Sequence, residues 1–470
     1  MSNKPEDSHE YSDSDDENAA ANLDIDEGKT GGWLGSSDSD DENDPLVKNE
    51  KKLAEIQNEF FADIDNGEST GQLVGREELE APAVDYDQVR ERASQIIMTL
   101  ENFKTAADPN ISRQTYINKL YDDLCLLFGY NRFLLEKIAS LVKVSELLDF
   151  LDANEHQRPV TIRKNTIRTH HNDLEHILND RGVRLAPVGK WTKLGLMVLE
   201  SQVPVGATPE YLSGYYMLQS PSSFLPVMAL NPKPGSRVLD MCAAPGGKTT
   251  HMAQLMKNSG VIVANDFNKA RTAALIANIH RLGVVNTIVV NYNGKAFPDV
   301  MGGFDYVLCD APCSGTGVIS RDPSVKTTKS EQDLQWLTQQ QKELILHAFD
   351  SVKSKGGKLC YCTCSVLVEE NEEVVDYLLR NRDGAKVIRP DIDKEFDEQL
   401  TKGIIRYEGK IFHDSIRNTR RVYPHNLNMD GFYFAMIDVL PHEQQKSNDV
   451  QIKREKKRDF SHKLGGYKNK

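Results

Sequence analysis

The stretch Arg237-Val-Leu-Asp-Met-Cys-Ala-Ala-Pro-Gly-Gly-Lys-Thr-Thr-His251 decides how this sequence folds. A short apolar run ends at Asp240, the chain turns at Ala-Pro-Gly-Gly, and a helix is expected to begin at Lys248. This order is typical of a doubly wound α/β unit, whose ligands bind outside the carboxyl ends of the strands. Gly246 and Gly247 allow bare backbone amides to approach a ligand closely. Such a glycine loop is generic, so the function must be sought in the residues downstream of it.

Strand and helix patterns alternate along the chain after this stretch. The predicted strands are 261–266, 287–291, 306–310 and 358–363, and the predicted helices are 268–282, 330–353 and 369–381. A late strand at 431–439 suits an antiparallel sheet edge. The sequence therefore predicts an α/β fold with a doubly wound, mostly parallel sheet and helices on both faces.

The rest of the chain divides by composition and periodicity. Residues 1–45 hold 15 Asp or Glu against 2 Lys or Arg, which accounts for the whole net charge of −13. Because this region is poor in apolar residues, we predict disorder there. It is either an interaction or phosphorylation tail or a solvating tail without a partner. The expected organisation is a disordered acidic tail at 1–80, a helical module at 85–155, a small α/β module at 156–207, the main domain at 208–442 with a helical start at 208–230, and a basic flexible tail at 443–470.

The small module at 156–207 is locally basic. A sheet with cationic side chains beside Trp191 would suit an RNA phosphate backbone, although an ordinary solvated face has the same composition. The basic residues are Arg158, Arg163, Lys164, Arg168, Arg181, Arg184, Lys190 and Lys193.

Composition also excludes several classes of protein. The sequence has no apolar run of 18 residues and no signal-peptide pattern at residue 1, so we expect a soluble intracellular protein without a membrane partner. Its seven cysteines are odd in number, and a disulfide framework is not expected in a reducing compartment.

Polar or reactive residues stand at the ends of the other predicted strands. Asp266 follows the loop glycines by about 20 residues, where a carboxylate can accept hydrogen bonds from a ribose diol. That spacing does not distinguish NAD from S-adenosylmethionine, and Asp266 could instead cap the helix that follows it. Asp310-Ala-Pro-Cys-Ser-Gly-Thr-Gly317 and Tyr361-Cys-Thr-Cys-Ser365 end two further strands.

In the doubly wound order these strand ends share one crevice, which would bring Cys313 and Cys364 together. Two thiols there suggest covalent catalysis, with one as nucleophile and one in proton transfer, without showing which attacks. Cys360, Cys362 and Cys364 could be metal ligands, but they lack the C-x2-C spacing or nearby histidines of a zinc site, and we expect no metal. No C-x-x-C redox motif occurs.

These residues together resemble the Nop/Sun family of RNA cytosine-C5 methyltransferases. The motifs that carry the resemblance are Asp-Met-Cys-Ala-Ala-Pro-Gly-Gly-Lys-Thr, Asp-Ala-Pro-Cys-Ser-Gly-Thr-Gly and Tyr-Cys-Thr-Cys-Ser. Four more are similar to the nucleolar, large-subunit ribosomal RNA branch: Tyr215-Tyr-Met-Leu-Gln-Ser, Gly302-Gly-Phe-Asp, Val318-Ile-Ser-Arg-Asp-Pro-Ser-Val-Lys326 and Asn428-Met-Asp-Gly-Phe432. The resemblance covers roughly residues 85–440.

The resemblance implies a fold of the S-adenosylmethionine-dependent methyltransferase type and a set of site residues. Cys364 would attack cytosine C6, Cys313 would remove the C5 proton, Asp310 would bond the base near N3 and Lys248 would assist. The implied contacts to S-adenosyl-L-methionine are Cys242, Ala243, Ala244, Pro245, Gly246, Gly247, Lys248, Asp266, Asn293 and Asp310. Asn293 departs from the aspartate usual in the family, so weaker cofactor binding is expected.

The resulting hypothesis is an enzyme that makes 5-methylcytosine in large-subunit ribosomal RNA during biogenesis of that subunit. The resemblance implies a nuclear, nucleolar location, precursor ribosomal RNA as substrate, and pre-ribosomal assembly proteins as partners. The alternative is a ribosome-assembly RNA-binding factor with secondary or lost methylation. A nicotinamide oxidoreductase is disfavoured because the loop lacks G-x-G-x-x-G.

Overall fold

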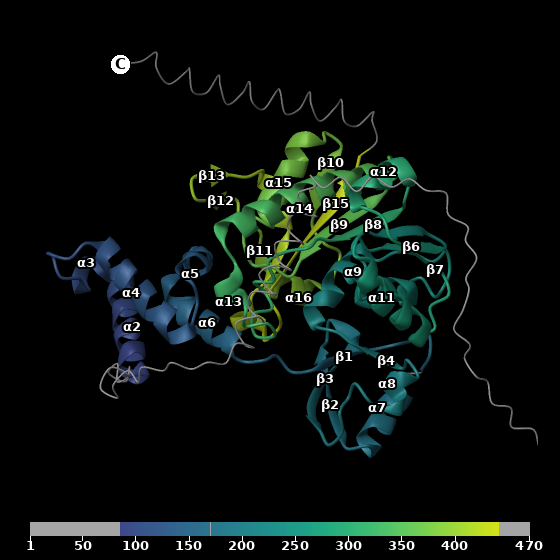
Figure 1. The fold of residues 1–470 in the computed structure, drawn as a ribbon, viewed down its shortest axis with the longest axis horizontal. Coiled ribbons are helices and arrows are strands. Elements are labelled where there is room, and N and C mark those ends of the chain that lie inside the picture. The colour runs from purple at the N-terminus through teal and green to yellow at the C-terminus, as the bar shows by residue number, and fades with distance from the viewer. Residues whose placement is uncertain (1–84, 170, 441–470) are drawn as a thin grey trace, which may run out of the picture. The chain divides into compact units, whose positions relative to one another are not determined.

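A computed structural model describes residues 85–169 and 171–440 (Figure 1). The predicted tails at 1–80 and 443–470 lie outside these residues.

One mixed sheet organises the described chain around the opening stretch. Its strand order is β11-β14-β15-β9-β8-β5-β6-β7. Strand β14 pairs with residues 432–434 of β15, and β10 pairs with residues 436–439 of the same strand. Strands β5 to β9 are parallel, whereas β15 runs antiparallel to β9. The strands are β5 (Arg237–Asp240), β6 (Val261–Asn265), β7 (Thr287–Val290), β8 (Tyr306–Asp310), β9 (Lys358–Thr363), β10 (Ala385–Ile388), β11 (Thr401–Lys402), β14 (Arg420–Val422) and β15 (Phe432–Val439); β12 (Arg406–Tyr407) and β13 (Lys410–Ile411) form a separate hairpin.

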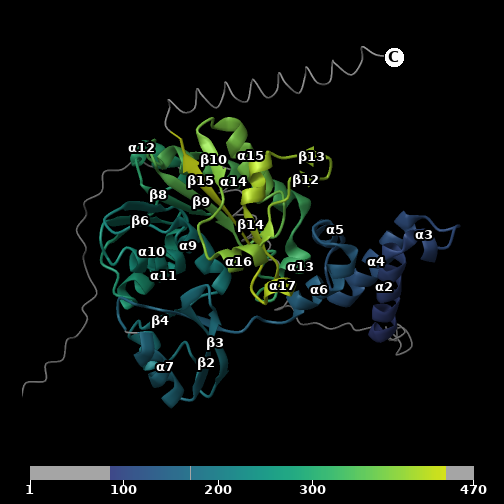
Figure 2. The same cartoon turned by 180° about the vertical axis from the view of Figure 1, so that it is seen from behind.

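Helices cover both faces of this sheet, as the alternation along β9 shows. Leu359 and Tyr361 pack with α14 and α15, and Cys360 and Cys362 pack with α9, α10 and α11, which group together in Figure 2. The doubly wound, mostly parallel sheet is therefore confirmed. The surrounding helices are α9 (Leu225–Leu230), α10 (Gly247–Leu255), α11 (Lys269–Arg281), η4 (Gly294–Ala296), α12 (Phe297–Val300), α13 (Val325–Thr328), α14 (Glu331–Ser351), α15 (Glu372–Asn381), α16 (Lys394–Gln399), η5 (Asp414–Asn418) and α17 (Pro424–Leu427).

The predicted helical start at 208–230 is wrong in its middle. Between α8 (Pro209–Leu212) and η3 (Pro221–Phe224) the chain forms β4 (Tyr216–Leu218), which pairs antiparallel with β1. Gly214, at φ +78°, makes the turn into this strand, and a Cβ there would lie 1.8 Å from the backbone oxygen of Arg281. Strand pairing and this close approach override the local helical pattern.

The small α/β module is an antiparallel sheet of order β2-β3-β1-β4. Two of its predicted phosphate-binding residues, Arg163 and Lys164, are buried and cannot face RNA. Arg163 donates to the Gly247 carbonyl, and its Nη2 lies 2.8 Å from Thr250 Oγ1. Arg163 therefore ties the module to the glycine loop. The module comprises β1 (Thr161–Lys164), α7 (His171–Asp180), β2 (Val183–Gly189), β3 (Thr192–Ser201), α8 and β4.

The helices before β1 pack onto the segments that follow β8 and β9. Their hydrophobic core includes Ile319, Val325 and Val366 of the main domain. Lys326 adds a bond of 2.6 Å to the Glu155 carboxylate. These helices are α2 (Tyr86–Glu101), α3 (Phe103–Ala106), α4 (Arg113–Phe128), α5 (Arg132–Ala139), η2 (Val144–Glu146) and α6 (Leu147–Glu155).

Candidate active site

The glycine loop connects β5 to α10 in a tight turn. The Gly246 N–H donates to the Ala243 carbonyl at 2.7 Å, and the Ala243 N–H donates to the Asn265 carbonyl at 2.7 Å. Gly246 has φ +99°, and a Cβ there would come within 2.9 Å of the Leu275 side chain. Glycine is therefore required both by the backbone conformation and by the packing of α11 against the loop.

Asp266 holds this loop from the end of β6. One carboxylate oxygen accepts the Ala244 N–H at 3.1 Å, and the other accepts the Asn268 N–H at 3.0 Å. The side chain is almost fully buried, yet it lines the cavity described below. Asp266 thus ties the glycine loop to the start of α11 and leaves further lone pairs for a ligand hydroxyl.

Asn293 lies at the neighbouring strand end, after β7. Its Oδ1 accepts the Lys295 N–H at 3.1 Å and so caps η4. Asparagine and aspartate are about equally good helix caps, so either residue could cap η4 in this way. The side chain is exposed and lines the same cavity as Asp266.

A cavity of about 450 Å³ joins these strand ends. Its volume falls in the usual range for a small-molecule site, about 300–1,000 Å³. Helix α14 closes one wall with Trp336, Gln340 and Leu344, which are spaced four residues apart on one helix face. The predicted residues that line the cavity are Cys242, Ala244, Asp266, Asn293, Asp310, Cys313 and Cys364.

The two predicted catalytic cysteines meet at one end of the cavity. The Sγ atoms of Cys313 and Cys364 are 3.2 Å apart, so the prediction that the strand ends bring them together is confirmed. Lys248 Nζ lies 2.6 Å from Asp310 Oδ2, and the Cys362 thiol lies 3.3 Å from the other oxygen of Asp310. Four of the predicted residues, from three different loops, therefore form one constellation.

Charge and burial shift the ionisation of this constellation. Burial alone would lower the pKa of Lys248, but the Asp310 carboxylate outweighs it and raises that pKa above its ordinary value. Contact with Cys364, followed by burial, raises the pKa of Cys313 well above its ordinary value. Burial likewise raises the pKa of Cys242. Lys248 is therefore a fixed cation beside the cysteine pair, and Cys242 stays a neutral thiol.

Several residues beside the site were not predicted. The buried side chains of Glu370 and Asn371 contact the two cysteine loops, and the buried Glu372 pairs with Arg421 of β14. Their only sequence signal was a polar run where the predicted helix 369–381 was expected to begin. Within the described ranges, no cluster of three or more His, Cys, Asp or Glu side chains suits a metal ion, and no helix is long and apolar enough to cross a membrane.

Asp240, at the end of β5, gives the stability of the fold a predicted pH dependence. It is buried and accepts Thr249 Oγ1 at 2.6 Å, and burial raises its pKa to about 7. In the unfolded chain the pKa of an aspartate is about 3.9. Between about pH 3.9 and pH 7 the folded protein therefore keeps a proton on Asp240 that the unfolded chain has lost, and the free energy of unfolding falls as the pH rises through this range. We expect Asp240→Asn to raise the melting temperature relative to wild type at pH 8 and less so at pH 5. Equal shifts at the two pH values would contradict this assignment.

Comparison with known proteins shows the family to which this chain belongs. Residues 227–438 match the family described as 16S rRNA methyltransferase RsmB/F. The 25S rRNA (cytosine-C(5))-methyltransferase nop2 of Schizosaccharomyces pombe is 46% identical over 452 residues, covering 89% of this chain and 73% of that protein. The chain belongs to the Nop/Sun family of RNA cytosine-C5 methyltransferases, in its Nop2 branch.

A second relative and a solved structure extend the comparison. The 28S rRNA (cytosine(4447)-C(5))-methyltransferase of Homo sapiens is 50% identical over 383 residues, covering 80% of this chain and 46% of that protein. A solved methyltransferase homolog protein from Pyrococcus horikoshii superposes with a TM-score of 0.61 at 32% identity, covering 68% of this chain and 99% of its own. The chain thus spans less than half of the human relative.

The cofactor of the Nop/Sun family is S-adenosyl-L-methionine, and the residues of the cavity fit it. Asp266 offers carboxylate lone pairs to a ribose, and Asn293 offers an amide to an adenine edge. Cys242 and Ala244 line the cavity from the glycine loop, and Phe267 supplies an exposed apolar face. Nothing in the lining is unsuited to a nucleoside.

Proposed function

We propose that this chain makes 5-methylcytosine in large-subunit ribosomal RNA, with S-adenosyl-L-methionine as the methyl donor. The observation that carries the proposal is the Cys313–Cys364 pair, 3.2 Å apart, at one end of a cavity that fits the cofactor. The relatives named for 25S and 28S rRNA methylation support the choice of RNA. We also propose that it acts in the nucleolus on precursor RNA, together with pre-ribosomal assembly proteins.

The chemistry assigns one task to each thiol. Cytosine C5 is a poor nucleophile, and bonding of Cys364 Sγ to C6 turns the ring into an enamine-like donor. Bound S-adenosylmethionine supplies an electrophilic methyl group for C5. Cys313 then takes the proton from C5, the C6–S bond breaks, and Cys364 leaves as a thiolate. The target base must first leave its stack to reach the cavity.

Lys248 and Asp310 are proposed to hold the base. Addition of a thiolate at C6 places negative charge on the N3 and O2 edge of the ring. The Lys248–Asp310 pair can present a hydrogen-bond donor to that edge and stabilise the charge as it develops. Because the ammonium is held by Asp310, it needs no reorganisation when the reaction occurs.

The proposed modules before residue 208 would bind RNA by shape and phosphate contacts. In the small module, Arg168, Lys190 and Lys193 are exposed, and two further exposed arginines pair with glutamates: Arg181 with Glu210 and Arg184 with Glu200. Trp191 stacks on Phe396 with ring centroids 4.4 Å apart, which joins this module to the main domain.

The test of the proposal is direct. The full chain would be incubated with S-adenosylmethionine and immature large-subunit RNA, and 5-methylcytosine would be measured by mass spectrometry of nucleosides. We expect methylation, and thermal stabilisation by S-adenosylhomocysteine but not by NAD. RNA binding without methylation would favour the assembly factor, and a thermal response to NAD alone would overturn the proposal.

Trp336 is predicted to stack on an RNA base at the rim of this site. Trp336 is 63% exposed and lines the cavity, and the Gln341 amide, five residues further along α14, donates to the carbonyl of Pro312, next to Cys313. Base stacking on an aromatic ring is worth about 1–3 kcal/mol, equivalent to about 5- to 150-fold in affinity. Trp336→Ala should raise the KM for RNA by that factor, and Trp336→Phe should restore most of it.

Tryptophan fluorescence gives the matching control for this prediction. RNA should quench the tryptophan emission of the wild type more than that of Trp336→Phe, because the variant lacks the indole that stacks on the base. Quenching by S-adenosylhomocysteine alone would instead assign the indole to the cofactor's adenine.

A further inference from the structure

Three consecutive polar residues, Glu370-Asn371-Glu372, lie fully buried where the segment after β9 leads into α15. Each side chain is 0% exposed. Burial of carboxylates and amides is costly unless every polar atom finds a partner. Their partners therefore show what the segment does: Glu370 and Asn371 bond the loops that carry the cysteines, and Glu372 bonds Arg421.

Glu370 holds the Cys313 loop. Its Oε1 accepts the Ser314 N–H at 2.8 Å, and its Oε2 accepts the Ser314 hydroxyl at 2.6 Å. The Gln341 amide bridges the same carboxylate, at 3.0 Å, to the Pro312 carbonyl, at 2.8 Å. The residues on both sides of Cys313 are thus fixed by one carboxylate and its amide partner.

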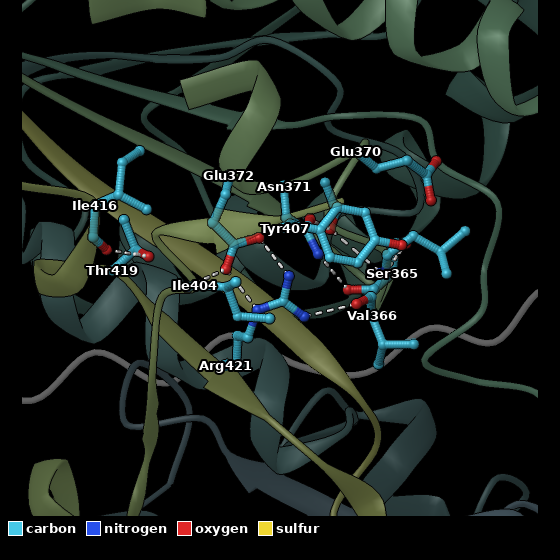
Figure 3. Close-up of polar contacts among 12 residues, drawn as sticks. Ser365, Val366, Glu370, Asn371, Glu372, Ile404, Tyr407, Ile416, Thr419 and Arg421 are labelled. Carbon is cyan, nitrogen blue, oxygen red and sulfur yellow. Dashed lines mark hydrogen bonds and ion pairs between the residues drawn. The ribbon is translucent and has the colours of Figure 1, made fainter. Parts of the chain in front are cut away.

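Asn371 holds the Cys364 loop in the same way. Its amide nitrogen donates to the Ser365 carbonyl at 2.9 Å, and its oxygen accepts the Thr363 hydroxyl at 2.6 Å. Figure 3 shows Asn371 and Ser365 facing each other, with Glu370 beyond them. The residues on both sides of Cys364 are therefore fixed by one amide.

Glu372 anchors this arrangement through Arg421. The guanidinium forms a two-pronged ion pair with Glu372 and donates from Nη1 to the Val366 carbonyl at 2.6 Å (Figure 3). The two loops are also joined to each other, since the Gly317 N–H donates to the Cys364 carbonyl at 2.8 Å. A hydroxyl contact of 3.0 Å between Thr316 and Ser365 adds a second tie.

We propose that Glu370 and Asn371 are positioning residues that set the two cysteines separately, Glu370 for proton removal by Cys313 and Asn371 for attack by Cys364. The proposal rests on the proposed methyltransferase function and deepens it. Neither residue lines the cavity, so both act through the loops. The Glu370 charge also adds to the contacts that raise the pKa of Cys313, after Cys364 and burial.

The two roles predict opposite effects on a covalent RNA adduct. Glu370→Gln keeps the shape but weakens the hold on Ser314, so adduct release should slow by about 10- to 100-fold and the adduct should accumulate above wild type. Asn371→Ala should slow adduct formation by about 10- to 100-fold, with no accumulation. Loss of the Glu370 charge should also move the pH dependence of release toward lower pH.

Matched controls lie on α15, the helix that follows Asn371. Glu373→Gln changes the carboxylate that follows Glu372; Glu373 pairs with Lys342 and Lys410 away from the cysteine loops. Asn381→Ala changes an exposed amide at the end of α15. Both should form and release the adduct at wild-type rates. Ser314→Ala removes one hydrogen bond to Glu370 and should slow adduct release in the same way as Glu370→Gln, but less. This variant tests the proposal if Glu370→Gln folds poorly.

The assay would follow adduct formation and decay on denaturing gels in single-turnover reactions, with thermal stabilisation by S-adenosylhomocysteine as a measure of an intact cofactor site. Unchanged stabilisation with opposite adduct effects would support the two positioning roles. Equal slowing of both steps in the two variants, or loss of stabilisation, would reduce the segment to a purely structural one. Absence of methylation in wild type would instead contradict the proposed function itself.

Discussion

Cys364→Ala is expected to abolish methylation, with turnover lowered by at least about 10³-fold. The Cys364 thiol lies 3.2 Å from Cys313 and forms part of the cavity lining, with Lys248 as a fixed cation nearby. Loss of a covalent nucleophile removes the step that activates C5. The measurement is methyl transfer to immature large-subunit RNA under single-turnover conditions.

Cys313→Ala should behave differently, because it removes the base and leaves the nucleophile. Release should slow by about 10²- to 10⁴-fold, the usual contribution of a positioned proton acceptor. A denaturation-resistant RNA–protein adduct should therefore accumulate in Cys313→Ala and be missing in Cys364→Ala. The opposite pattern would exchange the two roles. No adduct in either variant, with RNA binding retained, would point to an assembly factor.

The second large effect is expected on stability, at the Arg421–Glu372 pair. Both side chains are fully buried, and the Glu372 carboxylate outweighs burial and raises the pKa of Arg421 above its ordinary value. Arg421→Met would leave a buried carboxylate without its cation. Breaking a buried pair in this way costs about 3–5 kcal/mol. Urea unfolding should show this loss in the free energy of unfolding.

The double variant Arg421→Met, Glu372→Leu should recover part of that loss. It removes both charges, but it leaves the Val366 carbonyl and the Ile404 N–H without the partners they have at 2.6 and 3.0 Å. Each unsatisfied group costs about 1–3 kcal/mol, so recovery should be incomplete. Additive losses in the double-mutant cycle would show that the two charges do not interact.

The organising α/β domain could be predicted because its signals are local. Apolar runs ending in Asp240 and Asp310 marked β5 and β8, and the predicted strand at 358–363 coincides with β9. The parallel order then implied that their ends share a crevice, which is how Cys313 and Cys364 could be paired across 51 positions. The acidic and thiol residues that mark the strand ends are also the candidate site residues. The same features therefore predicted both the fold and the candidate site.

What could not be predicted depends on distant partners. Arg163 looked like a phosphate ligand, but its neighbours in space are Gly247 and Thr250, and burial lowers its pKa to about 9. The sequence predicted only a helix at 369–381, and burial of the polar run at its start was not expected because charged residues are rarely buried. Its partners come from the loop of Ser314, from α14 and from Arg421, and no local pattern reveals them.

The position of β15 has a consequence for how the protein is made. This strand comes last in the described chain, yet it lies between β9 and β14, and the neighbouring Gly431 N–H donates to the Gly317 carbonyl at 2.7 Å. During synthesis the cofactor loop and both cysteines emerge while one edge of β9 still lacks its partner strand. Unpaired apolar edges invite aggregation, so the nascent protein passes through a vulnerable stage that ends only when β15 is inserted.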